Sequence, residues 1–276
     1  AVGLTDRNGL YAAMGFSDYC IGEGVQPIIG ATLGLARPAD VPGGGIDWLV
    51  LLAKDEEGYA NLCRLVSAAH MERPDANAPH VSFSRLEQHA EGLIALTAGA
   101  EGAAARLLAD GQAHAAREYL QRLGAIFSDR LYVEISRRED PIEDAAEGAL
   151  IDLAYALDLP LVATNPAAYV ERDFHAAHDA LLCIANSAYI ESADRASSSE
   201  HAWLKPAAEM EALFDDLPEA LANTAVIAQR CAVAAPKRKP ILPRLSDDED
   251  EQLRRDAHAG LEQRLEGRSE EDKARY

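Results

Sequence analysis

The strongest constraint on the fold is an alternation between short apolar runs and longer segments with helical spacing. Six runs have the length and the aliphatic content of buried strands, namely residues 1–5, 27–33, 48–53, 93–97, 131–135 and 161–164. Strands that alternate with helices are typical of an α/β architecture with mainly parallel strands. Six strand candidates favour a barrel-like sheet, and an open doubly wound sheet stays the alternative.

Between these runs, apolar residues recur at the i, i+3, i+4, i+7 spacing that marks one buried face of a helix. Three such stripes are Tyr59, Leu62, Cys63 and Val66; Ala116, Leu120, Leu123 and Phe127; and Leu150, Leu153, Ala154 and Leu157. We expect all three to pack against the sheet. Loop 36–45 contains two prolines and three consecutive glycines, which predict a flexible connector.

Composition limits the function classes. The 276 residues are 48% hydrophobic, enough for a folded core, and 26 basic against 46 acidic residues give 26 − 46 = −20. Such a surface repels phosphate backbones, so nucleic-acid binding by this chain alone is disfavoured. The apolar runs are far shorter than the roughly 20 residues of a membrane span. The four cysteines lack metal or redox spacing, which predicts buried free thiols in a reducing cytoplasm.

The amino-acid composition changes after Cys231. Residues 236–240 (PKRKP) and Pro243 indicate an extended connector, and the acidic run 246–251 can cap a following helix. That helix would present Leu253, Ala257, Leu261 and Leu265. We therefore predict a boundary near residue 235.

Several stretches match the motifs of one known domain in order and spacing. They are Thr5-Asp6-Arg7-Asn8-Gly9, Ile28-Ile29-Gly30-Ala31-Thr32, Gly58-Tyr59-Ala60-Asn61-Leu62, residues 131–135, residues 161–169 (LVATNPAAY) and residues 217–224 (LPEALANT). On these motifs, nearly the whole chain resembles the PHP (polymerase and histidinol phosphatase) domain of bacterial C-family replicative DNA polymerases, the DNA polymerase III alpha subunits.

The resemblance implies a distorted, TIM-like (β/α)7 barrel of the PHP type. It assigns residues 1–235 to this domain and residues 236–276 to a linker and a helix leading to the polymerase palm. Residues 1–5 read as the middle of a strand, so we expect the first strand, with the family's His-x-His pair, upstream of Ala1.

The resemblance also identifies six positions that lie at the metal cluster in metal-binding relatives. They are Asp6, Arg7, Thr32, Ala100, Pro166 and Ala168. Only Asp6 keeps a ligand, because the others replace a His, an acidic residue, a Cys, an Asp and a His in that order. The guanidinium of Arg7 is cationic at physiological pH and repels a metal ion. We therefore expect a vestigial cluster, with no metal ligand set, no catalytic residue and no cofactor in this chain.

The function implied by the resemblance is that of a degenerate, metal-free PHP domain. It would support the polymerase and provide a docking surface for partner subunits such as the proofreading exonuclease, in the cytoplasm. The parent protein would synthesise DNA with Mg²⁺ in its palm and contact DNA through its polymerase domains. The alternative is a metal-dependent phosphoesterase or exonuclease that retains partial activity through Asp6, His178 and the upstream histidines. An error-prone relative of the same polymerase family is a third interpretation.

Two further features have simpler structural explanations. His175 and His178 could share one helix face, but without a third ligand nearby we expect one to cap or pack and the other to be exposed. Glu134 stands alone at the end of a strand candidate. We interpret it as a hydrogen-bonded structural carboxylate rather than a general base.

Overall fold

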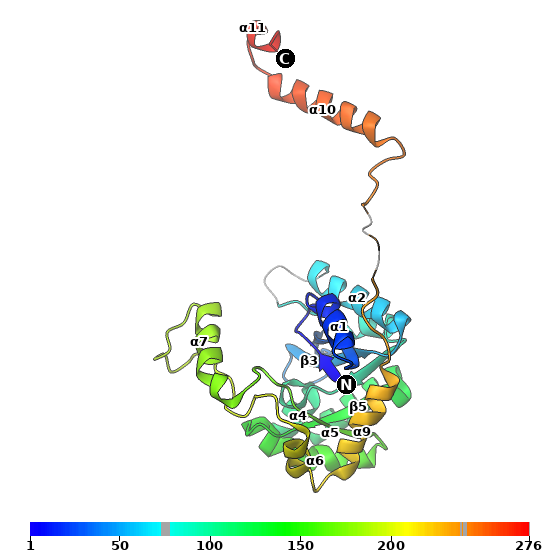
Figure 1. The fold of residues 1–276 in the computed structure, drawn as a ribbon, viewed down its shortest axis with the longest axis vertical. Helices are drawn as coiled ribbons and strands as arrows, with labels where there is room; N and C mark the ends of the chain where they lie inside the picture. Colours follow the sequence, from blue (N-terminus) through cyan, green and yellow to red (C-terminus); the bar gives the residue numbers. More distant parts are fainter. Residues whose placement is uncertain (73–77, 238, 240–241, 276) are drawn as a thin grey trace. The chain divides into compact units, whose positions relative to one another are not determined.

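The computed structural model describes residues 1–72, 78–237, 239 and 242–275, which form two compact units, Ala1–Pro236 and Lys237–Tyr276 (Figure 1). Of the expected connector, Arg238, Pro240 and Ile241 lie outside the described residues. The second unit contains α10 (Glu249–Leu265) and α11 (Glu270–Lys273). Asp248 caps α10, because its side chain accepts a hydrogen bond from the backbone N–H of Glu251.

The first unit contains a six-stranded curled sheet, consistent with the distorted barrel of the PHP type that the resemblance implied. Each strand overlaps one predicted run. The strands are β1 (Val2–Leu4), β2 (Pro27–Ala36), β3 (Ile46–Ala53), β4 (Leu93–Leu96), β5 (Leu131–Ser136) and β6 (Leu161–Thr164), in the spatial order β1-β2-β3-β4-β5-β6.

The prediction of mainly parallel strands is wrong for β3. The pairs β1–β2, β4–β5 and β5–β6 are parallel, whereas β3 runs antiparallel to both β2 and β4. The physical reason lies in the short connection formed by residues 37–45. A parallel crossover needs a dozen or more residues, so this connection can join β2 and β3 only as a hairpin.

The sheet is apolar on both faces, because successive strand residues point to opposite sides. On β3, Leu49 and Leu51 face the larger core cluster, and Val50 and Leu52 face the smaller one. Helices α2 (Glu56–Met71), α4 (Ala103–Ala109), α5 (Ala113–Phe127) and α6 (Pro141–Ala156) contribute to the larger cluster. The smaller cluster contains Ile227 from α9 (Pro218–Arg230).

The stripes of α5 and α6 are confirmed, since their predicted residues are buried except for the half-buried Leu157. On α2 the predicted face is rotated, because Leu62 and Leu65 are fully buried whereas Cys63 and Val66 are half-buried. The cause is the approach of this helix to the turn before β4. A Cβ on Gly58 would lie 1.8 Å from the backbone oxygen of Gly92, so only the side of the helix that carries this glycine can pack against the turn.

Loop 36–45 is held by Arg37. Its backbone N–H donates to the oxygen of Gly45 at 2.9 Å, and its Nη1 donates to the oxygen of Pro42 at 2.6 Å. Its Nε and Nη2 donate to the two carboxylate oxygens of Asp47, each at 2.7 Å. The connector is thus a hairpin loop closed around a buried guanidinium.

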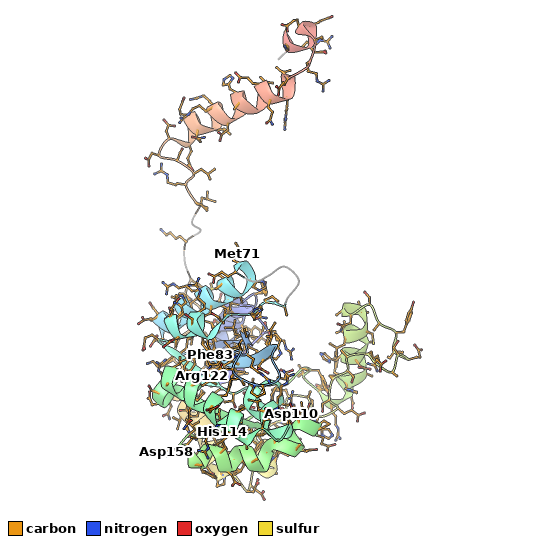
Figure 2. All side chains as sticks on the ribbon, turned by 180° about the vertical axis from the view of Figure 1, so that it is seen from behind. Met71, Phe83, Asp110, His114, Arg122 and Asp158 are labelled. Carbon is orange, nitrogen blue, oxygen red and sulfur yellow. The ribbon has the colours of Figure 1, made fainter. Side chains whose placement is uncertain are left out.

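The remaining helices of this unit are α1 (Ala13–Gly22), α3 (Phe83–Gln88), α7 (His175–Ala185) and α8 (Ala207–Leu213). Arg122 of α5 lies over the ring of Phe83 of α3, 6.0 Å from its centroid, and Figure 2 shows the two side by side. The four cysteines form no disulfide; three are buried and Cys63 is half-buried. Within the described part of the chain, no helix combines the length and apolarity needed to cross a membrane.

Candidate functional site

A cavity of about 250 Å³ lies on the sheet face that carries the smaller core cluster. Its apolar wall comes from the strands, including Ile28, Val50, Leu52 and Leu96. Its polar lining consists of Thr5, Thr32, Glu101, Glu134, Arg138, Thr164 and Asn165. Because β1, β2, β5 and β6 all contribute, the sheet curls around this space. Of the six positions that the resemblance assigns to a vestigial cluster, Thr32 and Pro166 line this cavity.

Glu134 of β5 is buried within this cavity, with 4% of its surface exposed. Its carboxylate accepts hydrogen bonds from the backbone N–H of Ala98 at 2.9 Å and from the hydroxyl of Thr164 at 2.7 Å. The expectation that Glu134 is hydrogen-bonded is therefore confirmed. Burial raises the pKa of Glu134 above its ordinary value of 4.5, and the two donors only partly offset this effect.

Replacing Glu134 with Gln is expected to stabilise the protein increasingly as pH rises. A raised pKa in the folded state means that the stability held by the protonated carboxyl is complete below about pH 4.5 and is lost as pH rises through the folded pKa. Gln keeps an acceptor for Ala98, and the Thr164 hydroxyl can rotate to accept from the amide. Urea unfolding of both proteins across this range measures the difference; a difference independent of pH would contradict the argument.

Arg7 lies just beyond β1, where its backbone forms an isolated parallel bridge with Thr32. Its Nη2 donates to Oε1 of Glu101, and its guanidinium lies 4.7 Å from the centroid of the Trp48 ring. This pair joins the segment after β1 to the short 3-10 helix Gly99–Glu101 after β4. A cation therefore stands at one of the six positions that the resemblance assigns to a vestigial metal cluster.

Thr32 and Asp6 are joined through the backbone, since the N–H of Thr32 donates to the oxygen of Asp6 at 3.0 Å. The hydroxyl of Thr32 donates a hydrogen bond to the backbone oxygen of Thr5 at 2.9 Å, and this bond joins β2 to the segment after β1. The Asp6 residue is exposed and lies outside the cavity lining. The carboxylate of Asp6 therefore has no acidic neighbour among the cavity-lining residues of β1, β2 and the segment after β1.

Ala100 is buried in the 3-10 helix directly before Glu101. Pro166 lines the cavity after β6, whereas Ala168 is exposed and its N–H donates to the oxygen of Ala202 at 2.7 Å. The structure thus brings Arg7, Thr32 and Pro166 to the cavity or to its direct neighbours and leaves Ala168 outside it.

His175 and His178 both pack, so the expectation that one is exposed is wrong. The Nε2 of His175 lies 3.0 Å from the oxygen of Ser198, and the Nδ1 of His178 lies 3.0 Å from the Oγ of the same residue. Both rings also contact the ring of Tyr169. The segment 195–199, distant in sequence, folds back onto this helix, which spacing within the helix could not reveal.

The donor set does not fit a divalent metal. In the ranges that the structure describes, no three His, Cys, Asp or Glu side chains gather where they could hold an ion. The cavity contains two acids and is bordered by two guanidinium groups, and Glu134 is already hydrogen-bonded. The buried Oδ1 of Asn165 lacks a hydrogen-bond partner, yet a single amide oxygen cannot replace the four to six ligands of such an ion.

Three lining residues were missed by the sequence reasoning, namely Glu101, Arg138 and Asn165. Glu101 directly follows Ala100, one of the six positions named from the resemblance, and this neighbour was the available signal. Asn165 belongs to the quoted motif, but its role in the lining depends on the curl of the sheet. Arg138 follows β5, and no spacing rule distinguishes it from the neighbouring Arg137.

Comparison with known proteins agrees with these observations. A family model described as the PHP domain matches residues 1–138. The DNA polymerase III subunit alpha of Caulobacter vibrioides is 42% identical over 278 residues, covering 97% of this chain and 24% of the relative. Those of Rickettsia bellii and Pseudomonas aeruginosa are 37% and 35% identical, covering 96% of this chain and 22% and 23% of the relatives.

The chain thus spans about a quarter of the length of the curated relatives it matches. The matched model covers half of the 276 residues, and the relatives align over nearly all of them. The resemblance inferred from the motifs is confirmed, and the chain belongs to the PHP domain family.

Proposed function

We propose that this chain is a degenerate, metal-free PHP domain of a replicative DNA polymerase III alpha subunit. Its role is to support the polymerase domains and to provide a docking surface for partner subunits such as the proofreading exonuclease. The parent protein carries out DNA-templated DNA synthesis with Mg²⁺ in its palm. The names of the relatives support this context.

The observation that carries the proposal is the position of Arg7. Its guanidinium is paired with Glu101 and stacked on Trp48, so a permanent positive charge stands beside the cavity. A divalent ion placed nearby would meet this cation and would find both lining acids already engaged, Glu101 by Arg7 and Glu134 by Ala98 and Thr164. The pair also joins the segment after β1 to the 3-10 helix after β4.

The net charge of −20 supports docking of proteins rather than tracking along DNA. The phosphoesterase alternative receives less support, because His178 is engaged with Ser198 and neither Asp6 nor His178 lines the cavity. Complex formation between the full-length parent and the exonuclease subunit, measured by size-exclusion chromatography, tests the docking role.

Metal analysis of the full-length parent tests the loss of chemistry. We expect far less than one Zn²⁺ or Mn²⁺ per PHP domain after dialysis, and no hydrolysis of single-stranded DNA or p-nitrophenyl phosphate above background. An Asp-to-Ala change in the polymerase palm serves as the control that removes the palm's own Mg²⁺ site. Stoichiometric metal together with chelator-sensitive hydrolysis would overturn the proposal.

Replacing Arg7 with His is expected not to restore metal binding. The change removes the repelling charge and returns one ligand, but Thr32, Ala100, Pro166 and Ala168 still supply none, and four to six ligands are needed. Because Arg7 is more than half exposed, losing its pair with Glu101 should reduce stability by about 1 kcal/mol or less. Isothermal titration with Mn²⁺ measures the binding, and tight binding by Arg7→His alone would contradict the ligand count.

A further inference from the structure

Helix α7 presents apolar side chains to solvent. Phe174, Leu181 and Ile184 are 57%, 60% and 75% exposed. With the exposed Ala177 they follow the i, i+3, i+7, i+10 spacing of a single helix face, and we call these four residues the α7 stripe. Just beyond the helix, Tyr189 and Ile190 are also exposed. An ordinary surface helix turns such a face to its own core.

The opposite face of α7 is polar and is fixed in place. Asp179 accepts two hydrogen bonds from Arg195, from Nη1 at 2.5 Å and from Nη2 at 2.6 Å. His175 and His178 contact Ser198 on the same side. These bonds hold residues 195–198 against one side of the helix. They therefore fix the rotation of α7 and leave the α7 stripe exposed to solvent.

The helix belongs to a projecting segment, residues 169–203, whose base is tied to the sheet. Tyr169 and Trp203 form an isolated bridge that closes the segment. Asn165, directly after β6, donates from Nδ2 to the oxygen of Trp203, and Ser199 donates to the oxygen of Arg138 after β5. Figure 1 shows α7 apart from the sheet and from the helices that cover it. The α7 stripe is therefore open along its length.

The exposed charges of residues 169–203 are mainly negative. Exposed acids in the segment are Glu171, Asp173, Glu191, Asp194 and Glu200, against the exposed Arg172. Arg195 is neutralised by Asp179. An apolar face on a negatively charged segment fits an apolar surface that is surrounded by basic residues. The same negative charge, together with the total of −20, repels a second copy of this chain.

We propose that the α7 stripe docks onto an apolar surface with a basic rim in another part of the same polypeptide. This inference rests on the proposed function, since it takes the chain to be part of a longer polymerase. The relatives are about four times as long as the matched region, and domains that handle DNA carry basic surfaces of the required sign. The docking holds residues 169–203, and with them the ends of β5 and β6, against the polymerase domains.

Photo-cross-linking in the full-length parent tests the docking. A benzoylphenylalanine in place of Ala177 lies within the α7 stripe, and one in place of Ala113, an exposed position of α5, is the matched control. We expect the probe at 177 to link to a Lys- or Arg-rich segment of the same polypeptide, and Leu181→Asp to reduce that yield roughly tenfold, because it places a charge in an apolar contact. Circular dichroism of the parent should show unchanged folding for Leu181→Asp.

Three outcomes would overturn the docking proposal. They are a link to another copy, a link that needs a separate subunit, and a yield at 177 no higher than at 113. Failure of the proposed function is recognised separately, because it is read from bound metal and hydrolysis and not from cross-links. Salt gives a further readout, since raising it from about 0.1 M to 1 M shortens the screening length from about 10 Å to 3 Å and should lower the yield.

Discussion

Replacing Asp47 with Ala should destabilise the protein by about 3–5 kcal/mol, since it leaves a buried cation without its partner. The side chains of Asp47 and Arg37 are almost completely buried, at 1% and 4% exposure, and form a two-pronged ion pair. Asp47 also accepts from Arg106 at 3.0 Å. The loss should loosen loop 36–45 as well, because Arg37 holds that loop through Pro42 and Gly45.

Denaturant unfolding at neutral pH measures this cost, and hydrogen exchange at the backbone N–H of Arg37, which donates to the oxygen of Gly45, reports the loosening. Asp40 is the matched control, because it forms a similar pair with Arg122 at 2.7 Å on the exposed surface. Asp40→Ala should cost far less, because solvent screens this exposed pair. Equal losses for the two variants would show that burial of the Arg37–Asp47 pair does not govern its contribution.

Replacing Phe214 with Ala should also cost about 3–5 kcal/mol, the usual range for removing a buried aromatic side chain. Phe214 is fully buried between α8 and α9 and belongs to the larger core cluster. The guanidinium of Arg137 lies 4.7 Å from its ring centroid and is fixed by Glu147, Asp216 and the oxygen of Leu213. Truncation leaves a cavity in the core and removes the ring from beneath a charge.

Phe214 lies beyond residues 1–138, where the PHP family model matches. Its replacement therefore tests whether the C-terminal part of the unit unfolds together with the matched part. If residues 139–236 share one core with the matched part, Phe214→Ala should shift a single unfolding transition. Phe174→Ala provides the control, since this exposed residue should change stability by no more than about 0.5 kcal/mol. A separate early transition in Phe214→Ala would instead show that the C-terminal part unfolds independently.

Strand positions were predictable because burial on both faces leaves an uninterrupted apolar run, as in residues 93–96 of β4. The reversed direction of β3 was missed, because the predicted runs end at residue 33 and resume at residue 48, which leaves room for a crossover. In the structure β2 extends to Ala36 and β3 begins at Ile46, and the short connection allows only a hairpin. The rotation of α2 also escaped prediction. Tyr59 and Val66 fit a helical stripe as well as Leu65 does, and only the contact between Gly58 and Gly92 decides which face meets the sheet.

At the site, the residue types could be read from the sequence, but which residues contact one another could not be predicted from it. The charge of Arg7 follows from its identity, but its pairing with Glu101 spans 94 positions and requires the segments after β1 and β4 to meet. Glu134 was correctly interpreted as hydrogen-bonded, while its donors Ala98 and Thr164 come from two other strand ends. His175 and His178 were misjudged for the same reason, since Ser198 approaches them from a distant loop.

The sequence alone determined the α/β class, the family and the side-chain types at the six positions that the resemblance assigns to a metal cluster, because these depend on local periodicity and side-chain identity. Tertiary structure decided the direction of β3, the burial of the Arg37–Asp47 pair and the outward direction of the α7 stripe. Each of these depends on which segments, distant in sequence, pack against one another. That arrangement is settled by the packing of the whole domain rather than by any single run of residues.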